Sequence, residues 1–437
     1  MIIPSIDLMN GKAVQLRQGK DLVLENGDPL NLAEKFYRYG PLAVIDLDAA
    51  LARGHNLALI KKLCRQYECR VGGGLRTTEQ VGEILAAGAS RVIIGTAAWK
   101  DKKLNQSFLS ELKSKFGKDS LILALDCLGE NIMIKGWTEN TGVKIFDIIP
   151  EASHYVSGFL VTCINREGCL QGTDLEFFSR IRKSSDLPVI AAGGITSAEE
   201  IAALSQLDMD VQLGMSIYTE KLKLPEAFAA SLNWQKGLEG LLPTIVYDEN
   251  GNVLMLAWSS PESLKKSLEN GLACYYSRSR KKLWIKGETT GNFQELLRVR
   301  SDCDGDSLLF VVRQKGSGAC HKGQQTCFGT ASFTLNHLFD VIRERLENPS
   351  PGSYTASLDH RLVREKLLEE AGELVEAETP EEIIWEAADL LYFTLVLLAR
   401  QNISFAEVLG ELQRRHRVKK LKDFLPQNSE KIDEVKA

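Results

Sequence analysis

Short apolar runs alternate with amphipathic stretches through the first half of the chain. The runs predict eight strands, at Ile2–Ile6, Ala43–Leu47, Cys69–Val71, Arg91–Ile94, Leu121–Leu125, Gly158–Val161, Pro188–Ala191 and Val211–Leu213. Between them, stretches such as Leu57–Cys64, Thr78–Ala87 and Ala198–Leu207 place apolar residues at helical spacing. Strands that alternate with helices favour a parallel α/β fold, which we expect over residues 1–232.

An internal repeat refines this prediction. Asp7 ends the first strand and Asp126 follows the fifth, 119 positions later (126 − 7). Gly73-Gly74 follows the third strand and Gly193-Gly194 the seventh, 120 positions later (193 − 73). Two half-barrels of four βα units explain both offsets. The sequence therefore predicts a (β/α)₈ TIM barrel that holds these residues at the C-terminal ends of its strands, where such barrels place their active sites.

These residue types indicate a substrate with a phosphate at each end. Glycine lets backbone N–H groups approach anionic oxygens at helix N-termini, so two equivalent glycine pairs imply two phosphate sites across the mouth. Asp7 and Asp126 would face each other between these sites, placed for general acid and base catalysis. A barrel strand also often ends in aspartate for structural reasons, which is the alternative for each residue taken alone.

Several motifs of this half resemble the histidine-biosynthetic isomerase that acts on phosphoribosylformimino-aminoimidazole carboxamide ribotide. The resemblance rests on Ile6-Asp7-Leu8, Val71–Arg76, Ile93–Ala97, Lys135-Gly136-Trp137 and Ala191–Ile195. It implies an Amadori rearrangement with Asp7 and Asp126 as base and acid, assisted by Thr162. The phosphate-binding positions that we expect are Gly73, Gly74, Gly95, Thr96, Gly193, Gly194 and Gly214.

The barrel departs from this family pattern at several positions. The family has aspartate where this chain has Cys163, Asp-Gly-Thr in place of Glu167-Gly168-Cys169, and glutamine in place of Arg70. Because Arg70 precedes the first glycine pair, we expect it to alter the pocket. The alternative function for the barrel is that of a scaffold or ligand-binding module.

Residues 238–330 predict a small mixed domain rich in strands. Leu242–Tyr247 and Val253–Trp258 flank a turn sequence and predict a hairpin, and Pro261–Glu269 predicts a helix. A basic and aromatic stretch, Tyr275–Asn292, follows. The chain has a net charge of −5, so this stretch favours a small phosphorylated ligand over a nucleic acid. Its expected ligand contacts are Arg278, Arg280, Lys282 and Lys286.

An acidic run precedes the apolar stretch Leu308–Val312. Its carboxylates alternate with other residues, at Asp302, Asp304 and Asp306. If the strand begins at this run, the three carboxylates share one face and Cys303 points the other way. Oxygen ligands suit Mg²⁺ and thiolates suit Zn²⁺, so the run can serve two metals. A calcium-binding EF-hand loop is excluded, because Ser307 stands where it needs glycine and Arg313 where it needs glutamate.

This region resembles phosphoribosyl-AMP cyclohydrolase almost continuously. The matching motifs are Leu254–Trp258, Tyr276–Arg280, Lys286-Gly287-Glu288, Asp302-Cys303-Asp304 and Ala319-Cys320-His321, followed by Cys327-Phe328. The resemblance implies a zinc ion held by Cys303, Cys320 and Cys327, the first donated across a dimer interface. It also implies Mg²⁺ on the three aspartates and hydrolytic opening of the adenine ring. His321 either shuttles a proton or orients the site.

Residues 333–420 predict an all-helical domain, and residues 421–437 a polar tail. Glu369, Glu373 and Glu376 share one helix face, and Glu386 and Asp389 interrupt the otherwise apolar helix Ile383–Ala399. Two acidic helix edges make a Mg²⁺ cradle for a polyphosphate. The expected ligands are Glu369, Glu370, Glu373, Glu386 and Asp389.

The acidic motif resembles the helical nucleotide pyrophosphohydrolases, and Lys366–Ala371 with Ala388–Tyr392 resembles phosphoribosyl-ATP pyrophosphohydrolase in particular. A general nucleotide pyrophosphatase is the alternative. The three resemblances imply consecutive steps of histidine biosynthesis in reverse chain order, in a fused enzyme whose substrates are phosphoribosyl nucleotides. The cyclohydrolase and pyrophosphohydrolase families also imply a homodimer.

Composition places further limits on function. The longest apolar run, Leu390–Ala399, is too short to span a bilayer, so we expect no membrane partner. The opening residues Met1–Pro4 predict a strand and not a signal sequence. Nine irregularly spaced cysteines argue against a disulfide framework and favour a reducing cytoplasm, with the clustered thiols as metal ligands.

Overall fold

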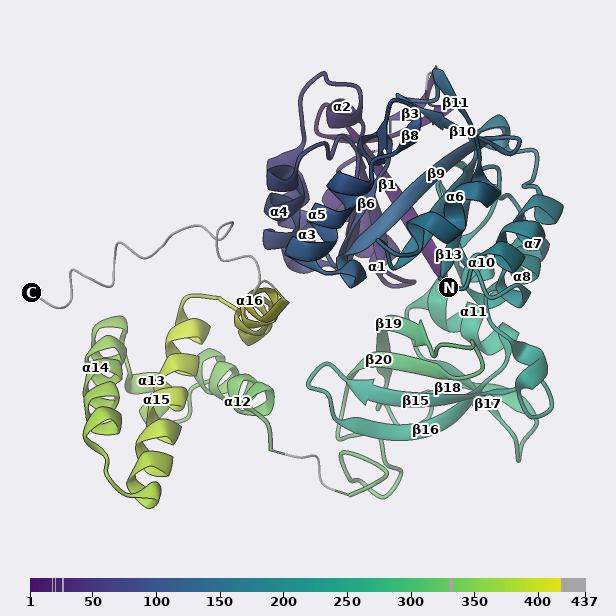
Figure 1. The fold of residues 1–437 in the computed structure, drawn as a ribbon. Coiled ribbons are helices and arrows are strands. Elements are labelled where there is room, and N and C mark those ends of the chain that lie inside the picture. The colour runs from purple at the N-terminus through teal and green to yellow at the C-terminus, as the bar shows by residue number, and fades with distance from the viewer. Residues whose placement is uncertain (18, 20, 26, 330–332, 418–437) are drawn as a thin grey trace, which may run out of the picture. The chain divides into compact units, whose positions relative to one another are not determined.

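The computed structural model describes residues 1–17, 19, 21–25, 27–329 and 333–417. The predicted tail at 421–437 lies outside them. The described residues form two compact units (Figure 1). The first contains Met1–Glu249 and Val253–Gly329, and the second is built from the described residues between 333 and 415.

Eight parallel strands close a barrel in the first unit, as the sequence predicted. Each pairs with the next, and β14 returns to pair with β1, which closes the ring. The strands are β1 (Ile2–Met9), β4 (Leu42–Asp46), β5 (Cys69–Gly72), β6 (Arg91–Ile94), β9 (Leu121–Leu128), β12 (Gly158–Cys163), β13 (Val189–Ala192) and β14 (Asp210–Leu213).

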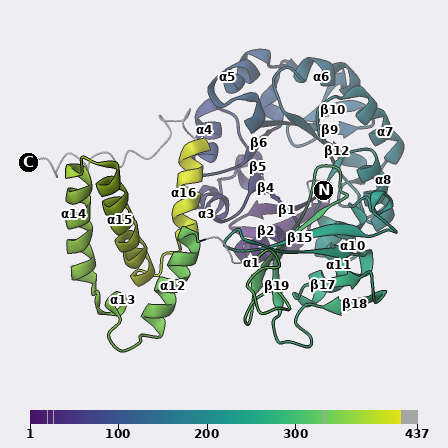
Figure 2. The same cartoon turned by 90° about the horizontal axis from the view of Figure 1, so that it is seen from below.

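Helices surround the strands, and Figure 2 shows α3 to α8 arranged as a ring outside them. The helices of this region are α1 (Pro29–Tyr37), α2 (Leu47–Ala50), α3 (Leu57–Gln66), α4 (Thr78–Ala86), α5 (Gln106–Phe116), α6 (Ile145–Ala152), α7 (Leu175–Ser184), α8 (Ala198–Gln206), α9 (Met215–Tyr218) and α10 (Leu224–Ala230). Each half-barrel also carries an antiparallel excursion after its first strand: β2 (Lys12–Arg17) with β3 (Asp21–Glu25), and β10 (Asn131–Ile134) with β11 (Glu139–Lys144).

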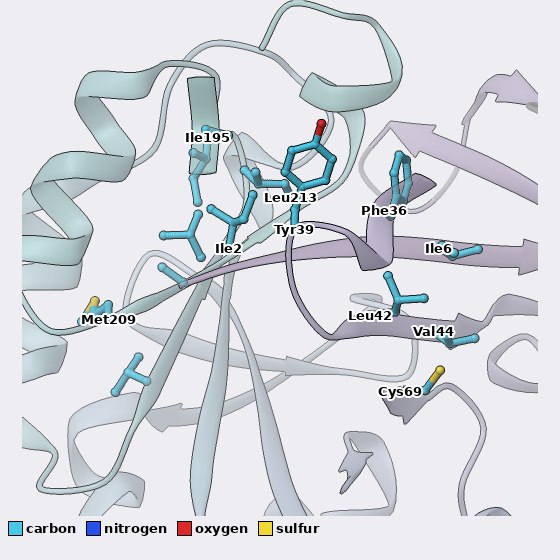
Figure 3. Close-up of a cluster of buried hydrophobic side chains, with 14 of the residues drawn as sticks. Ile2, Ile6, Phe36, Tyr39, Leu42, Val44, Cys69, Ile195, Met209 and Leu213 are labelled. Carbon is cyan, nitrogen blue, oxygen red and sulfur yellow. The ribbon is translucent and has the colours of Figure 1, made fainter. Parts of the chain in front are cut away.

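The barrel buries both faces of its strands. Outward-facing residues pack beneath the helices; Figure 3 shows Ile2 and Ile6 of β1 and Leu42 of β4 with Phe36 and Tyr39. Inward-facing residues form a separate central cluster of Ile3, Ala43, Ile93, Ile122, Leu160, Ile190 and Ala192. Strands buried on both sides are near-continuously apolar, which explains why simple runs predicted them well.

Arg70 does not lie at the catalytic face, contrary to the expectation from its place in the sequence. It is the second residue of β5, its side chain is buried, and its guanidinium lies 3.6 Å from Asp210 at the start of β14. The N-terminal amine lies 3.0 Å from the same carboxylate. Because parallel strands begin at one end of a barrel, these charges gather at the end opposite the cavity.

A four-stranded sheet follows the barrel in the order β16-β15-β20-β19. Its strands are β15 (Leu242–Asp248), β16 (Val253–Ser259), β19 (Gln294–Ser301) and β20 (Leu308–Gln314), and the additional elements are helix α11 (Pro261–Asn270) and the hairpin β17 (Cys274–Ser277) with β18 (Lys282–Ile285). The acidic run does not begin a strand as predicted. It forms the turn between β19 and β20, because Gly305 adopts a left-handed conformation with φ +71°.

Arg298 of β19 links this sheet to the barrel. Its side chain is buried, its guanidinium carbon lies 3.7 Å from the centre of the Tyr37 ring, and Nη1 donates to the Tyr37 hydroxyl at 2.6 Å. The next residue, Val299, donates its backbone N–H to the Arg38 carbonyl at 3.0 Å. The barrel and the sheet therefore share a structured contact within the first unit.

The second unit is helical. It contains α12 (Leu335–Glu347), α13 (Tyr354–Ser357), α14 (His360–Glu376), α15 (Pro380–Arg400) and α16 (Phe405–Arg417), and α14 and α15 lie side by side in both overall views (Figures 1 and 2). Its core is small and includes Ile342, Val363 and Val396. Across the residues that the structure describes, no helix is long and apolar enough to cross a membrane.

Candidate functional sites

A cavity of about 650 Å³ opens at the C-terminal ends of the barrel strands. All ten barrel residues that the sequence singled out line it: Asp7, Gly73, Gly74, Gly95, Thr96, Asp126, Thr162, Gly193, Gly194 and Gly214. Residues from both halves of the repeat therefore meet around one space, whose size suits a small-molecule ligand.

The two glycine pairs occupy matching positions in the two half-barrels. Gly73 and Gly193 have φ of +92° and +99°, and an added Cβ would lie only 2.3 Å from the Asp46 carbonyl oxygen or 2.6 Å from that of Cys163. Both sites thus require glycine, because a side chain would collide with the backbone of the neighbouring strand.

The helices after these pairs do not offer free N-termini. α4 and α8 each carry a capping box, in which Thr77 or Ser197 accepts from the backbone of the first turn. The short helices that begin after Gly95 and Gly214 lack a side-chain cap. Their N–H groups, together with the glycine loops, are the donors best placed for phosphate oxygens.

Asp7 and Asp126 are both half-buried in the cavity wall. Ser5 Oγ donates to Asp7 at 2.7 Å, yet burial dominates and raises the pKa of Asp7 to about 6. Burial also raises the pKa of Asp126, opposed by hydrogen bonds from Trp137 and Thr162. Thr162 lies directly beside Asp126 in the register of β12 on β9, which explains its contact.

The sequence reasoning missed Glu167 and Trp137 as site residues. Glu167 lines the same cavity, and burial followed by the charges of Asp7 and Asp126 raises its pKa to about 7. Glu167 occupies a position where the resembled family has aspartate. Both residues carry a carboxylate, so this position was the signal in the sequence that could have identified it. Trp137, part of a matching motif, also lines the cavity.

The acidic turn brings its three carboxylates together, with ligand oxygens of Asp302, Asp304 and Asp306 all within 4.8 Å of one another. One oxygen of Asp302 accepts the backbone N–H groups of Asp306 and Ser307, at 3.0 and 3.1 Å. The side chain therefore folds the turn around itself, as aspartate commonly does. A set of three carboxylates fits Mg²⁺, which takes oxygen ligands.

Two of the three predicted zinc ligands meet in this chain. Cys320 and Cys327 lie close enough to interact, because burial followed by the charge of Cys320 raises the pKa of Cys327. Burial lowers the pKa of the nearby Lys286, whereas the charges of Cys327 and Cys320 act to raise it. Cys303 is exposed on the acidic turn, and the described residues contain no cluster within 4.8 Å that joins it to the other two sulfurs. Two adjacent thiols and an exposed third fit zinc if a second copy supplies the third.

The predicted phosphate contacts of the cyclohydrolase-like part lie in two places. Arg278 stacks its guanidinium 4.3 Å from the centre of the Trp258 ring, and Arg280 lies 5.9 Å from that of Trp284. Lys282 begins β18 and is exposed. His321 is exposed next to Cys320. The tip of the β17–β18 hairpin thus presents positive charge, while Lys286 lies buried beside the cysteines and not with it.

In the helical unit, Glu370, Glu373 and Glu386 place ligand oxygens within 4.8 Å of one another. Burial followed by the charges of Asp389 and Glu373 raises the pKa of Glu370, so Asp389 lies close to this group. Glu369 does not join the three; Lys366 holds it at 2.7 Å. Four neighbouring carboxylates repel one another unless cations offset them, and they fit Mg²⁺ bound with phosphate.

Comparison with known proteins agrees with this layout. The family model described as histidine biosynthesis protein matches residues 1–223 of the 437. The chain belongs to this family. The models for phosphoribosyl-AMP cyclohydrolase and phosphoribosyl-ATP pyrophosphohydrolase match residues 255–329 and 335–416. The three resemblances, and their order in a fused histidine-biosynthesis chain, are confirmed.

Curated relatives cover different parts of the chain. The histidine biosynthesis bifunctional protein HisIE of Pyrococcus furiosus is 42% identical over 208 residues, 44% of this chain and 99% of that protein. The trifunctional protein of Saccharomyces bayanus is 43% identical over 180 residues, 41% of this chain and 22% of its own length. That of Neurospora crassa is 32% identical over 339 residues, 76% of this chain and 35% of its own length. The chain thus spans between about a fifth and a third of these trifunctional relatives.

Proposed function

We propose that this member of the histidine biosynthesis family catalyses three consecutive reactions. Residues 333–420 would release pyrophosphate from phosphoribosyl-ATP, residues 238–330 would open the adenine ring of phosphoribosyl-AMP, and residues 1–232 would isomerise the product. The observation that carries the proposal is that one chain contains three separate sites. The chemistry of each site suits the family whose model matches that segment of the chain.

In the helical part, Glu370, Glu373, Glu386 and Asp389 would hold Mg²⁺ against the triphosphate. When bound, the ion supplies positive charge that offsets the phosphates and activates water. Lys366 Nζ lies 2.7 Å from Glu369 and 3.9 Å from Glu370, so we assign Glu369 a supporting place beside the ligands.

In the middle part, Cys320 and Cys327 would hold Zn²⁺ together with Cys303 of a second copy. Bound zinc supplies a water of lowered pKa, which suits hydrolytic attack on a purine ring. His321 lies next to a ligand, where it can pass a proton. The acidic turn would hold Mg²⁺, and Arg278 and Arg280 offer charge to the substrate phosphate.

In the barrel, we infer that Asp7 is the general base of the Amadori rearrangement. With a pKa of about 6 it is mostly ionised at pH 7, yet basic enough to take the proton from C2 of the ring-opened sugar, next to the imine carbon C1; the enolamine that results becomes the ketone of the product. Asp126, held by Thr162 and Trp137, is the predicted acid. Glu167 is a second donor to the ring oxygen, because a pKa of about 7 leaves it half protonated at neutral pH.

We also propose that the enzyme is a homodimer in the cytoplasm. The Cys303 position favours a shared zinc site. Large apolar side chains are exposed on α14 and α15, among them Leu368 at 78%, Val375 at 85% and Trp385 at 70%. Several large apolar side chains exposed on neighbouring helices favour burial against another copy. A reducing compartment would keep the metal-binding thiols free to ligate.

The proposal is tested with the purified full chain, Mg²⁺ and Zn²⁺, given each intermediate separately. We expect pyrophosphate from phosphoribosyl-ATP, loss of the adenine absorption from phosphoribosyl-AMP, and a ribulosyl product from the ring-opened compound. Failure of only the last reaction would leave a bifunctional enzyme with the barrel as scaffold. Failure of either hydrolysis would remove the corresponding assignment.

A further inference from the structure

The segment that leaves the barrel contacts the acidic turn directly. After α10, the backbone N–H of Asn233 donates to the Gly305 carbonyl at 2.8 Å. Three residues on, Lys236 Nζ lies 2.7 Å from an oxygen of Asp304. We propose that Lys236 is a positioning residue of the acidic turn: it acts as a tethered cation that competes with a divalent ion for Asp304 and so sets the affinity of the metal site. This inference rests on the proposed Mg²⁺ site.

Local contacts hold the backbone of Lys236 in place. It ends a short 3₁₀ turn, Trp234–Lys236, in which its own N–H donates to Asn233 at 3.2 Å. The Trp234 ring packs against the hydrophobic core, and its indole N–H donates to the Ala229 carbonyl at 2.7 Å. The backbone beneath Lys236 is therefore held beside the acidic turn, and only its exposed side chain has to be ordered to form the ion pair.

The acidic turn contacts the segment after α10 through Gly305 as well. A Cβ at Gly305 would lie 3.4 Å from the Asn233 nitrogen and 3.6 Å from the Ser231 carbonyl oxygen, with φ already at +71°. These are ordinary contact distances, so it is the left-handed backbone conformation of Gly305, and not lack of space, that favours glycine here. The barrel segment and the acidic turn are therefore in direct contact, with the exposed side chain of Lys236 paired to Asp304.

Competition follows from the ligand requirements of the ion. One oxygen of Asp302 already accepts two backbone N–H groups of the turn, and Asp304 is engaged by the ammonium of Lys236. A divalent ion that uses Asp304 must displace that ammonium or share the carboxylate with it, against the repulsion of like charges. Removal of the lysine charge should therefore tighten metal binding.

The test measures Mn²⁺ binding to the full chain by electron paramagnetic resonance. Every protein carries Glu373→Ala, which removes the helical metal group from the measurement. We expect Lys236→Met to bind Mn²⁺ at the acidic turn about two- to five-fold more tightly than the parent, the range of exposed ion pairs. Lys236→Arg should keep the parent affinity because it keeps the charge. The difference between Lys236→Met and the parent should shrink at high salt.

A matched control and a site variant separate the possible failures. Lys315 pairs with Glu295 at 3.4 Å in the same part of the chain, and its side chain is 48% exposed against 46% for Lys236. Lys315→Met should leave Mn²⁺ affinity unchanged. Equal or weaker binding in Lys236→Met, while Asp306→Asn abolishes the site, would overturn the role of Lys236 alone. Binding that survives Asp306→Asn would overturn the metal assignment and this inference with it.

Discussion

Replacement of Asp7 by asparagine tests the chemistry of the barrel and its energetic cost together. Burial raises the pKa of Asp7 from 3.8 to about 6 in the folded protein, whereas in the unfolded chain it ionises near its ordinary value of about 3.9. The folded state therefore binds more protons than the unfolded state between about pH 4 and 6, and its stability falls as pH rises through this window.

The size of this effect follows from the shift. About two pKa units at about 1.36 kcal/mol each set an upper bound of about 3 kcal/mol. The cavity admits water, which screens the charge, so we expect Asp7→Asn to stabilise the barrel by about 1–2 kcal/mol at pH 7.5. Below about pH 4 the gain should vanish, because both states are then protonated at this position.

Scanning calorimetry across pH 4 to 7.5 measures the stability, and conversion of the ring-opened intermediate measures the activity. Loss of a general base should slow isomerisation by about 10²- to 10⁴-fold. Asp186→Asn, at an exposed position of the same barrel, should change neither quantity. Unchanged turnover in Asp7→Asn would refute the catalytic role. A stability gain that does not grow with pH would refute the electrostatic reasoning.

Three further predictions concern the other parts of the chain. Cys320→Ala should abolish ring opening and spare pyrophosphate release, while Cys274→Ala, at a buried cysteine outside the cluster, should retain both; ring opening that persists in Cys320→Ala would remove the zinc assignment. Glu373→Ala should lower pyrophosphate release at least 10²-fold and let phosphoribosyl-ATP accumulate, whereas Glu376→Ala, one turn further along the same helix and outside the group of three, should behave like the parent. Arg298→Ala should lower stability by about 1–3 kcal/mol in calorimetry, because it removes a buried stacking and hydrogen-bonding contact with the barrel; an unchanged unfolding profile would contradict that contact.

Much of the barrel could be predicted because its signals are local. Buried parallel strands are apolar along their whole length, so Ile2–Ile6 and Leu121–Leu125 stand out as runs. Gly73 and Gly193 are required by their backbone conformation, and their spacing in the two halves revealed the repeat. The ten predicted cavity residues then follow from barrel geometry, which brings all strand ends to one face.

The features that the sequence did not predict depend on backbone conformation or on contacts between distant segments. Alternation placed the carboxylates of the acidic run on a strand, but Gly305 and the backbone bonds to Asp302 make a turn there instead. Glu167 follows β12, and its pKa is raised by burial and by the charges of Asp7 on β1 and Asp126 on β9. Local pattern identifies residue types, whereas tertiary packing decides which of them meet.

The central claim is that one chain carries phosphoribosyl-ATP through all three reactions. The direct measurement is a time course by ¹H nuclear magnetic resonance on the full chain with phosphoribosyl-ATP, Mg²⁺ and Zn²⁺. Because isomerisation leaves the mass unchanged, the decisive signal is the anomeric proton of the sugar that is isomerised. We predict that adenine ring signals disappear first and that this anomeric signal is then replaced by that of a methylene group next to a ketone. A reaction that stops with the ring opened and the anomeric signal intact would contradict the claim.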